Sequence, residues 1–174
     1  MATKIAINGF GRIGRCIARI LAARDSGDLE LVGINDLTDA KTLVHLLQFD
    51  SVHGAFGKDV QAVDGALVIG GKRIPILAER DPAKLPWKAL GAEIVLECTG
   101  LFTSKEKAIP HLHAGAKRVI ISAPGGADVD ATFCVGINVN AYDPGKHFVV
   151  SNASCTTNCL APVAKVLNER FGIV

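Results

Sequence analysis

A glycine-rich turn near the N-terminus constrains the fold of this chain more than any other feature. Residues 9–14 read Gly-Phe-Gly-Arg-Ile-Gly, with the glycines at Gly9, Gly11 and Gly14. The pattern follows an apolar run at residues 4–8 and precedes a segment whose apolar residues recur at helical spacing. A strand, a tight glycine turn and a helix in this order predict the first crossover unit of a parallel sheet.

The spacing of the glycines and of a later acid points to a dinucleotide. Gly9 would allow the tight turn, Gly11 would let backbone N–H groups reach a pyrophosphate, and Gly14 would permit close helix packing. A second apolar run at residues 29–35 ends before Asp36, which follows Gly14 by about 20 residues. A carboxylate there accepts hydrogen bonds from ribose hydroxyls and repels a 2′-phosphate, so the pattern favours NAD over NADP. The alternative is that Asp36 only caps a helix or a turn.

The rest of the chain repeats the alternation of apolar runs and helical patterns. Two residues, Gly70-Gly71, separate two apolar runs and predict a β-hairpin. The fold class expected is α/β, a Rossmann-type doubly wound and mostly parallel sheet with an inserted β-hairpin. Residues 1–152 would form an NAD-binding domain, and residues 153–174 would begin a catalytic segment. Further strands are expected at residues 93–98, 117–122, 133–135 and 147–150, and helices at 39–47, 105–113 and from about 154 to 171.

Composition excludes several classes of partner. The 174 residues carry a formal net charge of +2, and no window holds a dense basic run, so neither nucleic acid nor an anionic membrane is the expected partner. Five irregularly spaced cysteines and a start without the pattern of a secretory signal indicate reduced thiols and a cytoplasmic protein. No metal site is expected, because His111 and His113 would point apart on a helix.

Cys155 is the candidate nucleophile. It lies between Ser154 and Thr156, where an apolar strand gives way to the last helical pattern. The positive end of that helix would favour the thiolate, the reactive form of cysteine, whereas a lone cysteine can also be a small core residue. Cys159 follows one helical turn later and would either resolve an oxidised Cys155 or pack, and packing is favoured.

Together these motifs resemble glyceraldehyde-3-phosphate dehydrogenase, over the length of this chain and half the length of a typical family member. The residues that carry the resemblance are Ile7 to Arg15, Asn35-Asp36-Leu37, Glu97-Cys98-Thr99-Gly100, Ser122-Ala123-Pro124 and Ala153 to Asn158. The resemblance implies that Arg12 and Ile13 meet the pyrophosphate, Asp36 the adenosine ribose and Arg80 the adenine edge. It also implies that the path to the nicotinamide is lined by Thr99, Gly100, Phe102 and Ser122.

The resemblance further implies a glycolytic reaction, the NAD-dependent phosphorylating oxidation of glyceraldehyde 3-phosphate with inorganic phosphate. Cys155 would form the thioester, its own N–H would stabilise the oxyanion, and Ser154 and Thr156 would contact phosphate or substrate. The family's histidine base has no counterpart here, because no histidine follows Cys155. A homo-oligomer, a tetramer in the family, is also implied. Two alternatives stay open: erythrose 4-phosphate dehydrogenase, and a stand-alone NAD-binding module with a redox thiol or an inactive oligomer partner.

Overall fold

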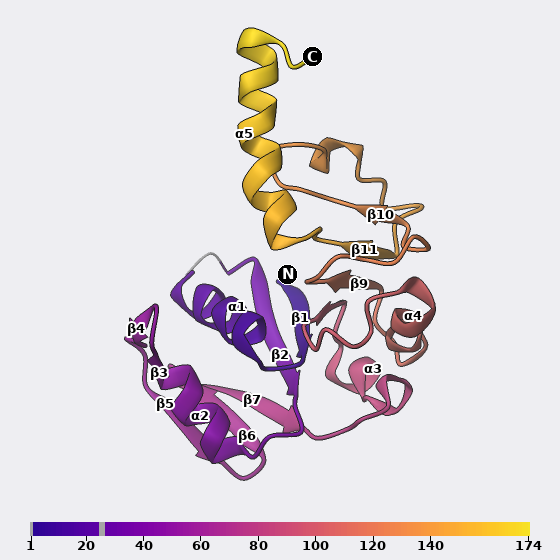
Figure 1. Ribbon diagram of the computed structural model, residues 1–174. Coiled ribbons are helices and arrows are strands. Elements are labelled where there is room, and N and C mark those ends of the chain that lie inside the picture. The colour runs from indigo at the N-terminus through magenta and orange to yellow at the C-terminus, as the bar shows by residue number, and fades with distance from the viewer. Residues whose placement is uncertain (1, 25–26) are drawn as a thin grey trace.

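A twisted, mostly parallel sheet with helices on both faces forms the body of the molecule. The computed structural model describes residues 2–24 and 27–174 (Figure 1). The strands are β1 (Thr3–Asn8), β2 (Leu29–Asn35), β3 (Phe49–Asp50), β4 (Gly54–Ala55), β5 (Val60–Val63), β6 (Ala66–Ile69), β7 (Lys72–Leu77), β8 (Ile94–Glu97), β9 (Arg118–Ile121), β10 (Ala131–Thr132) and β11 (Val149–Ser151). The helices are α1 (Arg12–Ala23), α2 (Ala40–Gln48), α3 (Trp87–Leu90), α4 (Lys105–His113) and α5 (Cys155–Phe171), with short 3₁₀ turns at Pro82–Lys84 and Val139–Ala141.

The strand order confirms the expected fold class. In the described chain the large sheet runs β10-β11-β9-β8-β1-β2-β7-β6-β5, and β3 pairs with β4 in a separate two-stranded sheet. Every pairing from β10 to β7 is parallel, and β5 and β6 are added in antiparallel fashion. The Gly70-Gly71 turn joins β6 to β7 with both glycines at positive φ, as the hairpin prediction requires.

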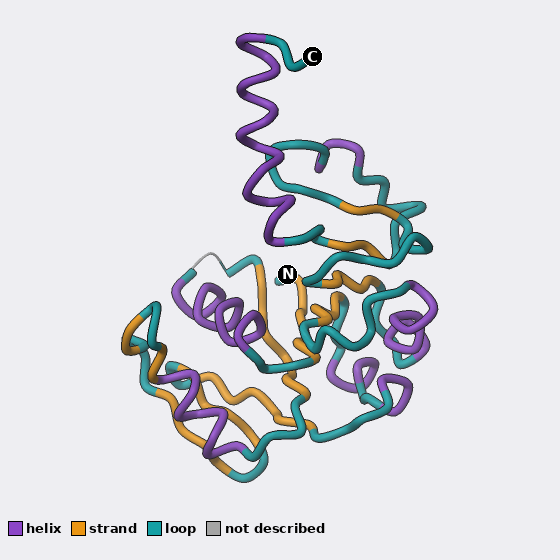
Figure 2. The backbone as a smooth tube through the Cα atoms, viewed as in Figure 1, coloured by secondary structure: helices purple, strands orange, loops and turns teal. Residues whose placement is uncertain are grey.

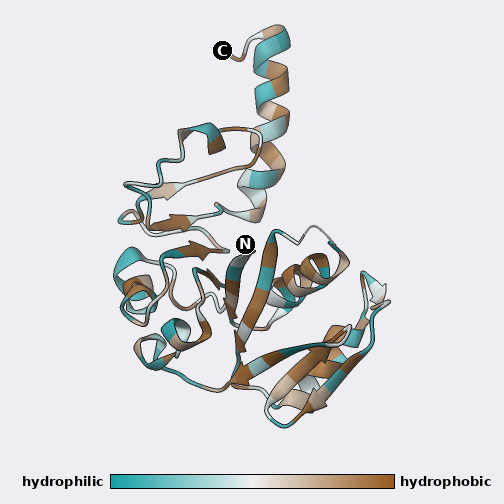
Figure 3. Cartoon of the chain, turned by 180° about the vertical axis from the view of Figure 1, so that it is seen from behind, coloured by the Kyte–Doolittle hydropathy of each residue, from teal (hydrophilic) through white to brown (hydrophobic). Residues whose placement is uncertain are grey.

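Alternating side chains of the buried strands divide the core between the two faces. Ile7 of β1 packs in a cluster with Ala18 of α1 and Leu43 of α2. Its neighbour Ala6 points to the other face, where it packs with Trp87 of α3. Figure 3 shows the strands of this sheet as largely hydrophobic, as expected for a parallel sheet covered on both sides.

The helix starts follow from capping residues that the sequence supplies. Asp39 accepts a hydrogen bond from the backbone N–H of Thr42 and caps α2, and Ser104 caps α4 in the same way. Ser154 caps α5 through the N–H of Thr157, and Gly172 ends that helix. The expected boundaries of these three helices are therefore confirmed to within about a residue.

The strand expected at residues 133–135 is wrong, because β10 ends at Thr132. Asn138 explains the break: its side chain accepts the N–H of Cys134 and donates to the carbonyl of Thr132, which closes a local turn. Figure 2 shows that the chain between β9 and β11 is mostly loop.

Helix α5 projects away from the sheet (Figure 1). None of its residues is buried, and Pro162 lies inside it. The large apolar side chains that it exposes are Leu160, Val163, Val166, Leu167 and Phe171.

Candidate functional site

The loops that follow the central parallel strands meet at one edge of the sheet. Because β1, β2, β8, β9 and β11 run parallel, Gly9, Asp36, Thr99, Ser122 and Ser154 all follow strand ends at this carboxyl edge. A pocket of about 430 Å³ opens there between the ends of β1, β2 and β8. Open parallel sheets bind ligands at this position. The pocket is lined by Asn8, Gly9, Gly11, Asn35, Asp36, Leu37, Glu79, Arg80, Cys98, Thr99, Leu101 and Phe102.

The three glycines of the turn differ in what surrounds them. Gly9 has a φ of +91°, and a Cβ there would lie 2.6 Å from the backbone N of Thr99. A Cβ on Gly14 would lie 2.3 Å from the carbonyl O of Gly9, so α1 can pack this closely only without a side chain. A Cβ on Gly11 would meet nothing within 4 Å, and no side chain caps the start of α1. The N–H groups of that first turn are therefore open to an anion, which fits the pyrophosphate of a dinucleotide.

Asp36 holds the glycine turn against the end of β2. Its Oδ2 accepts a hydrogen bond from the backbone N of Phe10 at 2.7 Å, and its Oδ1 accepts one from the N of Thr38 at 2.9 Å. Asp36 therefore does cap a turn, which was the alternative role considered for it. A carboxylate has about four lone-pair sites, so two of them stay available for ribose hydroxyls at the pocket.

The structure brings six of the expected cofactor residues together in the pocket lining and leaves five outside it. Those inside are Gly9, Gly11, Asp36, Arg80, Thr99 and Phe102, and those outside are Arg12, Ile13, Gly14, Gly100 and Ser122. The side chain of Arg12 instead forms an ion pair with Asp50 of β3. Backbone N–H groups of His53 and Val52 donate to Asp50 and, with Arg12, hold the pKa of its carboxyl at about 2. The Ile13 side chain is half exposed.

A buried polar network that sequence reasoning missed lies directly behind the pocket. Glu97, at the end of β8, is 1% exposed, and His111 of α4 is fully buried. His111 Nε2 lies 3.0 Å from Glu97 Oε2, and the indole N–H of Trp87 donates to His111 Nδ1 at 3.0 Å. An acidic residue at the end of the apolar run Ile94-Val95-Leu96 was the signal that could have revealed it.

Cys155 is exposed at the first position of α5, four residues beyond the last residue of β11. Three strand spacings separate β11 from β1, roughly 14 Å across the sheet. The side chain of Asn158 ties the first turn of α5 down by donating to the carbonyls of Asn152 and Ser154. The preceding Ala153 adopts a φ of +58°, an unusual conformation for a residue with a side chain.

Ser154 and Thr156 flank Cys155 in the sequence at the start of α5. The Ser154 hydroxyl is 2.8 Å from the hydroxyl of Thr156. Cys159 is exposed, so the expectation that it packs is wrong for the described chain, whereas Cys134 is buried. Burial raises the pKa of the Cys98 thiol to about 11.

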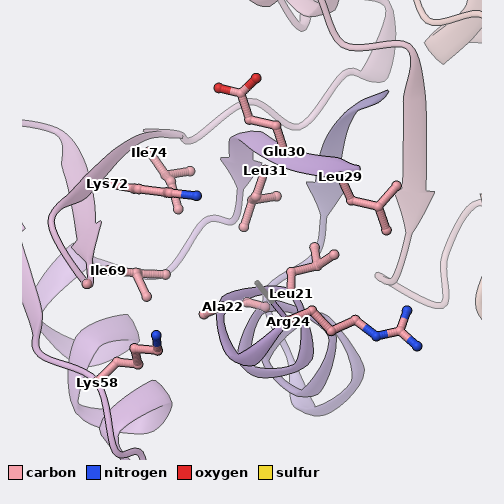
Figure 4. Close-up of a pocket in the computed structure, with 12 residues that line it drawn as sticks. Leu21, Ala22, Arg24, Leu29, Glu30, Leu31, Lys58, Ile69, Lys72 and Ile74 are labelled. Carbon is pink, nitrogen blue, oxygen red and sulfur yellow. The ribbon is translucent and has the colours of Figure 1, made fainter. Parts of the chain in front are cut away.

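A second crevice, of about 230 Å³, lies between α1, the start of β2 and the β6–β7 hairpin. Figure 4 shows Leu31 and Ile69 facing it, while Arg24 and Glu30 turn their charged ends away. Aliphatic side chains line it together with the charged side chains of Arg24, Glu30, Lys58 and Lys72, whose charged ends do not converge on one point. The crevice therefore lacks the arrangement of polar groups expected of a small-molecule site.

Residues 2–24 and 27–174 lack two kinds of feature. They contain no group of three or more His, Cys, Asp or Glu side chains placed to hold a metal ion. None of their helices has the length and hydropathy needed to cross a bilayer.

Two family models match separate parts of this chain. Residues 3–105 match the family model "Glyceraldehyde 3-phosphate dehydrogenase, NAD binding domain", which confirms NAD as the expected cofactor, and residues 154–174 match the C-terminal domain of the same enzyme. The chain is 57% identical over 171 residues to glyceraldehyde-3-phosphate dehydrogenase 1 of Bacillus cereus, with 98% of this chain and 50% of the relative aligned. It is 57% identical to the Geobacillus stearothermophilus enzyme over 174 residues, with 100% of this chain and 51% of the relative aligned. The chain thus spans about half the length of these curated relatives.

Proposed function

Because this chain belongs to the glyceraldehyde 3-phosphate dehydrogenase family, we propose that it supplies the cofactor pocket and the cysteine nucleophile for the NAD-dependent phosphorylating oxidation of glyceraldehyde 3-phosphate. The observation that carries this proposal is the shared carboxyl edge of the sheet. The open start of α1 and the exposed Cys155 at the start of α5 both lie there.

Different residues of the pocket would bind different parts of NAD. The N–H groups at the start of α1 would bind the pyrophosphate, and Asp36 would accept hydrogen bonds from the adenosine ribose. Arg80 lies on the Asp36 side of the pocket, and Thr99 and Phe102 lie on the side of β8. The nicotinamide half would therefore extend past β8 toward β11 and Cys155.

In the proposed reaction the Cys155 thiolate attacks the carbonyl carbon of the aldehyde and forms a thiohemiacetal. The chemistry that NAD supplies when bound is acceptance of the hydride from that carbon, which leaves a thioester on Cys155. Inorganic phosphate then attacks the thioester, the carbon–sulfur bond breaks, and the thiolate is regenerated as the acyl phosphate leaves. The backbone N–H of Cys155 would stabilise the oxyanion in both additions.

The neighbouring hydroxyls would position the anionic groups of this reaction. Ser154 and Thr156, whose hydroxyls lie 2.8 Å apart, flank Cys155 in the sequence and would donate to phosphate or substrate oxygens. No residue of this chain is assigned as the general base, because no histidine follows Cys155.

The proposal is tested by ligand titration followed by turnover. Calorimetry should show that the chain binds NAD more tightly than NADP. NADH formation from glyceraldehyde 3-phosphate and phosphate should appear when a polypeptide covering the remaining half of the Geobacillus relative is added. In that mixture Cys155→Ser should abolish turnover, and the matched control Cys159→Ser should retain it. Absence of NAD binding, or turnover that survives Cys155→Ser, would refute the proposal.

A further inference from the structure

The buried side chain of Asn35, the last residue of β2, ties the segment after β7 to the sheet. Its Oδ1 accepts the backbone N–H of Glu79 at 2.9 Å, and its Nδ2 donates to the carbonyl of Glu79 at 2.8 Å. An amide that bonds both backbone groups of one residue reproduces the pair of hydrogen bonds that neighbouring strands exchange. Backbone pairing of β2 with β7 ends at Leu77, so the side chain of Asn35 continues the attachment for two more residues.

The orientation of the Asn35 amide is set by the buried polar network beneath it. The carboxylate of Glu97 accepts a hydrogen bond from Asn8 Nδ2 at 2.6 Å, which turns the Oδ1 of Asn8 toward Asn35. That oxygen can only accept, so Asn35 presents its NH₂ group to Asn8 at 2.7 Å and keeps its own Oδ1 for the N–H of Glu79. Each donor in this series meets an acceptor, and only one orientation of each amide satisfies the whole series.

The segment held by Asn35 forms the wall of the pocket next to Asp36. Both Glu79 and Arg80 line the pocket. Glu79 Oε1 accepts the backbone N–H of Asp81 at 2.9 Å, and Asp81 caps the following 3₁₀ turn by accepting the N–H of Ala83. The backbone of Arg80 therefore lies between two residues that are each hydrogen-bonded in place.

We propose that Asn35 is a positioning residue that fixes the Glu79–Arg80 wall of the NAD pocket through the backbone of Glu79. The inference rests on the proposed binding of NAD at this pocket and deepens it. Asn35 makes no contact with the cofactor in this role, because both hydrogens of its NH₂ group are already donated, one to Asn8 and one to Glu79. The family resemblance places Arg80 at the adenine edge, so the effect falls on the part that NAD and AMP share.

The substitution Asn35→Ala tests this role. Without the amide the wall is no longer held in place, and binding must order it, so the dissociation constant for NAD should rise about fivefold or more. AMP should lose affinity by the same factor, to within about twofold. A merely structural role would lower the fraction of the chain that binds, which calorimetry reads as the stoichiometry, and would leave the dissociation constant of the folded chain unchanged.

Asn138 offers a matched control at the other side of the sheet. Its side-chain amide also bridges two backbone groups, the N–H of Cys134 and the carbonyl of Thr132. Asn138→Ala therefore removes the same kind of tie from a loop that does not line the pocket. Its dissociation constant for NAD should stay within about twofold of wild type.

Two substitutions of Glu79 test the route through its backbone. Glu79→Pro removes the N–H that Asn35 accepts, whereas Glu79→Ala keeps that N–H and removes the same carboxylate. The proline variant should therefore bind NAD more weakly than the alanine variant. In a double-mutant cycle of Asn35→Ala with Glu79→Pro, the combined loss should be smaller than the product of the single losses, because both changes break the same tie.

Any of five calorimetric results would overturn the inference: unchanged NAD affinity in Asn35→Ala, a loss for NAD that AMP does not share, an equal loss in Asn138→Ala, equal affinities of the two Glu79 variants, or fully multiplicative losses in the cycle. If Asn35→Ala does not fold, the two Glu79 variants still decide. Failure of the wild-type chain to bind NAD would instead refute the proposed function.

Discussion

The same added methyl group should mainly lower stability at Gly14 and mainly weaken NAD binding at Gly11. At Gly14 an added Cβ would lie 2.3 Å from the carbonyl O of Gly9, a contact with backbone that cannot rotate away. Overpacking of this kind costs up to about 3 kcal/mol, and the higher helix propensity of alanine returns about 1 kcal/mol. Gly14→Ala should therefore lower the free energy of unfolding by about 2 kcal/mol.

At Gly11 the same methyl group meets nothing within 4 Å, and the φ of −70° is open to alanine. The free energy of unfolding should fall by less than about 1 kcal/mol, the range of a helix N-cap change. The methyl group would, however, stand over the N–H groups at the start of α1. We expect Gly11→Ala to weaken NAD binding at least tenfold.

Urea denaturation and NAD calorimetry on both variants measure the two effects separately. The matched pair controls for the chemical change, because each variant adds one methyl group to the same turn. A Gly14→Ala protein as stable as wild type, or a Gly11→Ala protein that binds NAD within about twofold of wild type, would refute the reasoning.

Three further predictions concern the cysteines, α5 and Asp50. Limiting iodoacetamide at neutral pH should label Cys155 faster than Cys98, whose burial raises its thiol pKa to about 11; equal labelling by mass spectrometry would contradict this. The apolar side chains exposed along α5 should drive concentration-dependent association of the chain, which Phe171→Ser should reduce; a monodisperse monomer in sedimentation at high concentration would count against it. Because the folded pKa of Asp50 is depressed, its stabilisation is complete above about pH 4 and is lost as the pH falls toward 2. The difference in unfolding free energy between wild type and Asp50→Asn should therefore shrink on acidification, and a difference independent of pH would show that Asp50 does not stabilise through its charge.

The predictable parts of the fold were those that short stretches of sequence encode. Gly70-Gly71 specified a hairpin, and Ser154 and Gly172 bounded α5, because turn and capping chemistry is local. The β5–β6 hairpin was missed, although the dipeptide Asp64-Gly65 is a typical signal of a tight hairpin turn. Both residues adopt the positive φ that such a turn favours.

The candidate site was predicted where a motif carries it and missed where distant residues meet. Gly9 and Asp36, which the glycine motif singled out, line one pocket with Thr99, which the family resemblance named, and their roles toward NAD stay predictions. The pairing of Glu97 with His111 depends on how α4 packs against the sheet, and no local pattern specifies that contact. The partner of Arg12 was missed for the same reason, since Asp50 is 38 residues away in sequence.

Pro162 divides α5 into two parts with different attachment. Proline has no N–H, so the carbonyl of Asn158 lacks its usual donor four residues later, and the helix is weakened just beyond its first turn. The side chain of Asn158 nevertheless fastens that first turn to the end of β11. Beyond Pro162 the helix is attached through Lys165, which donates to the carbonyl of Gly136, so a bend at Pro162 would displace Phe171 and leave the first turn with Cys155 in place.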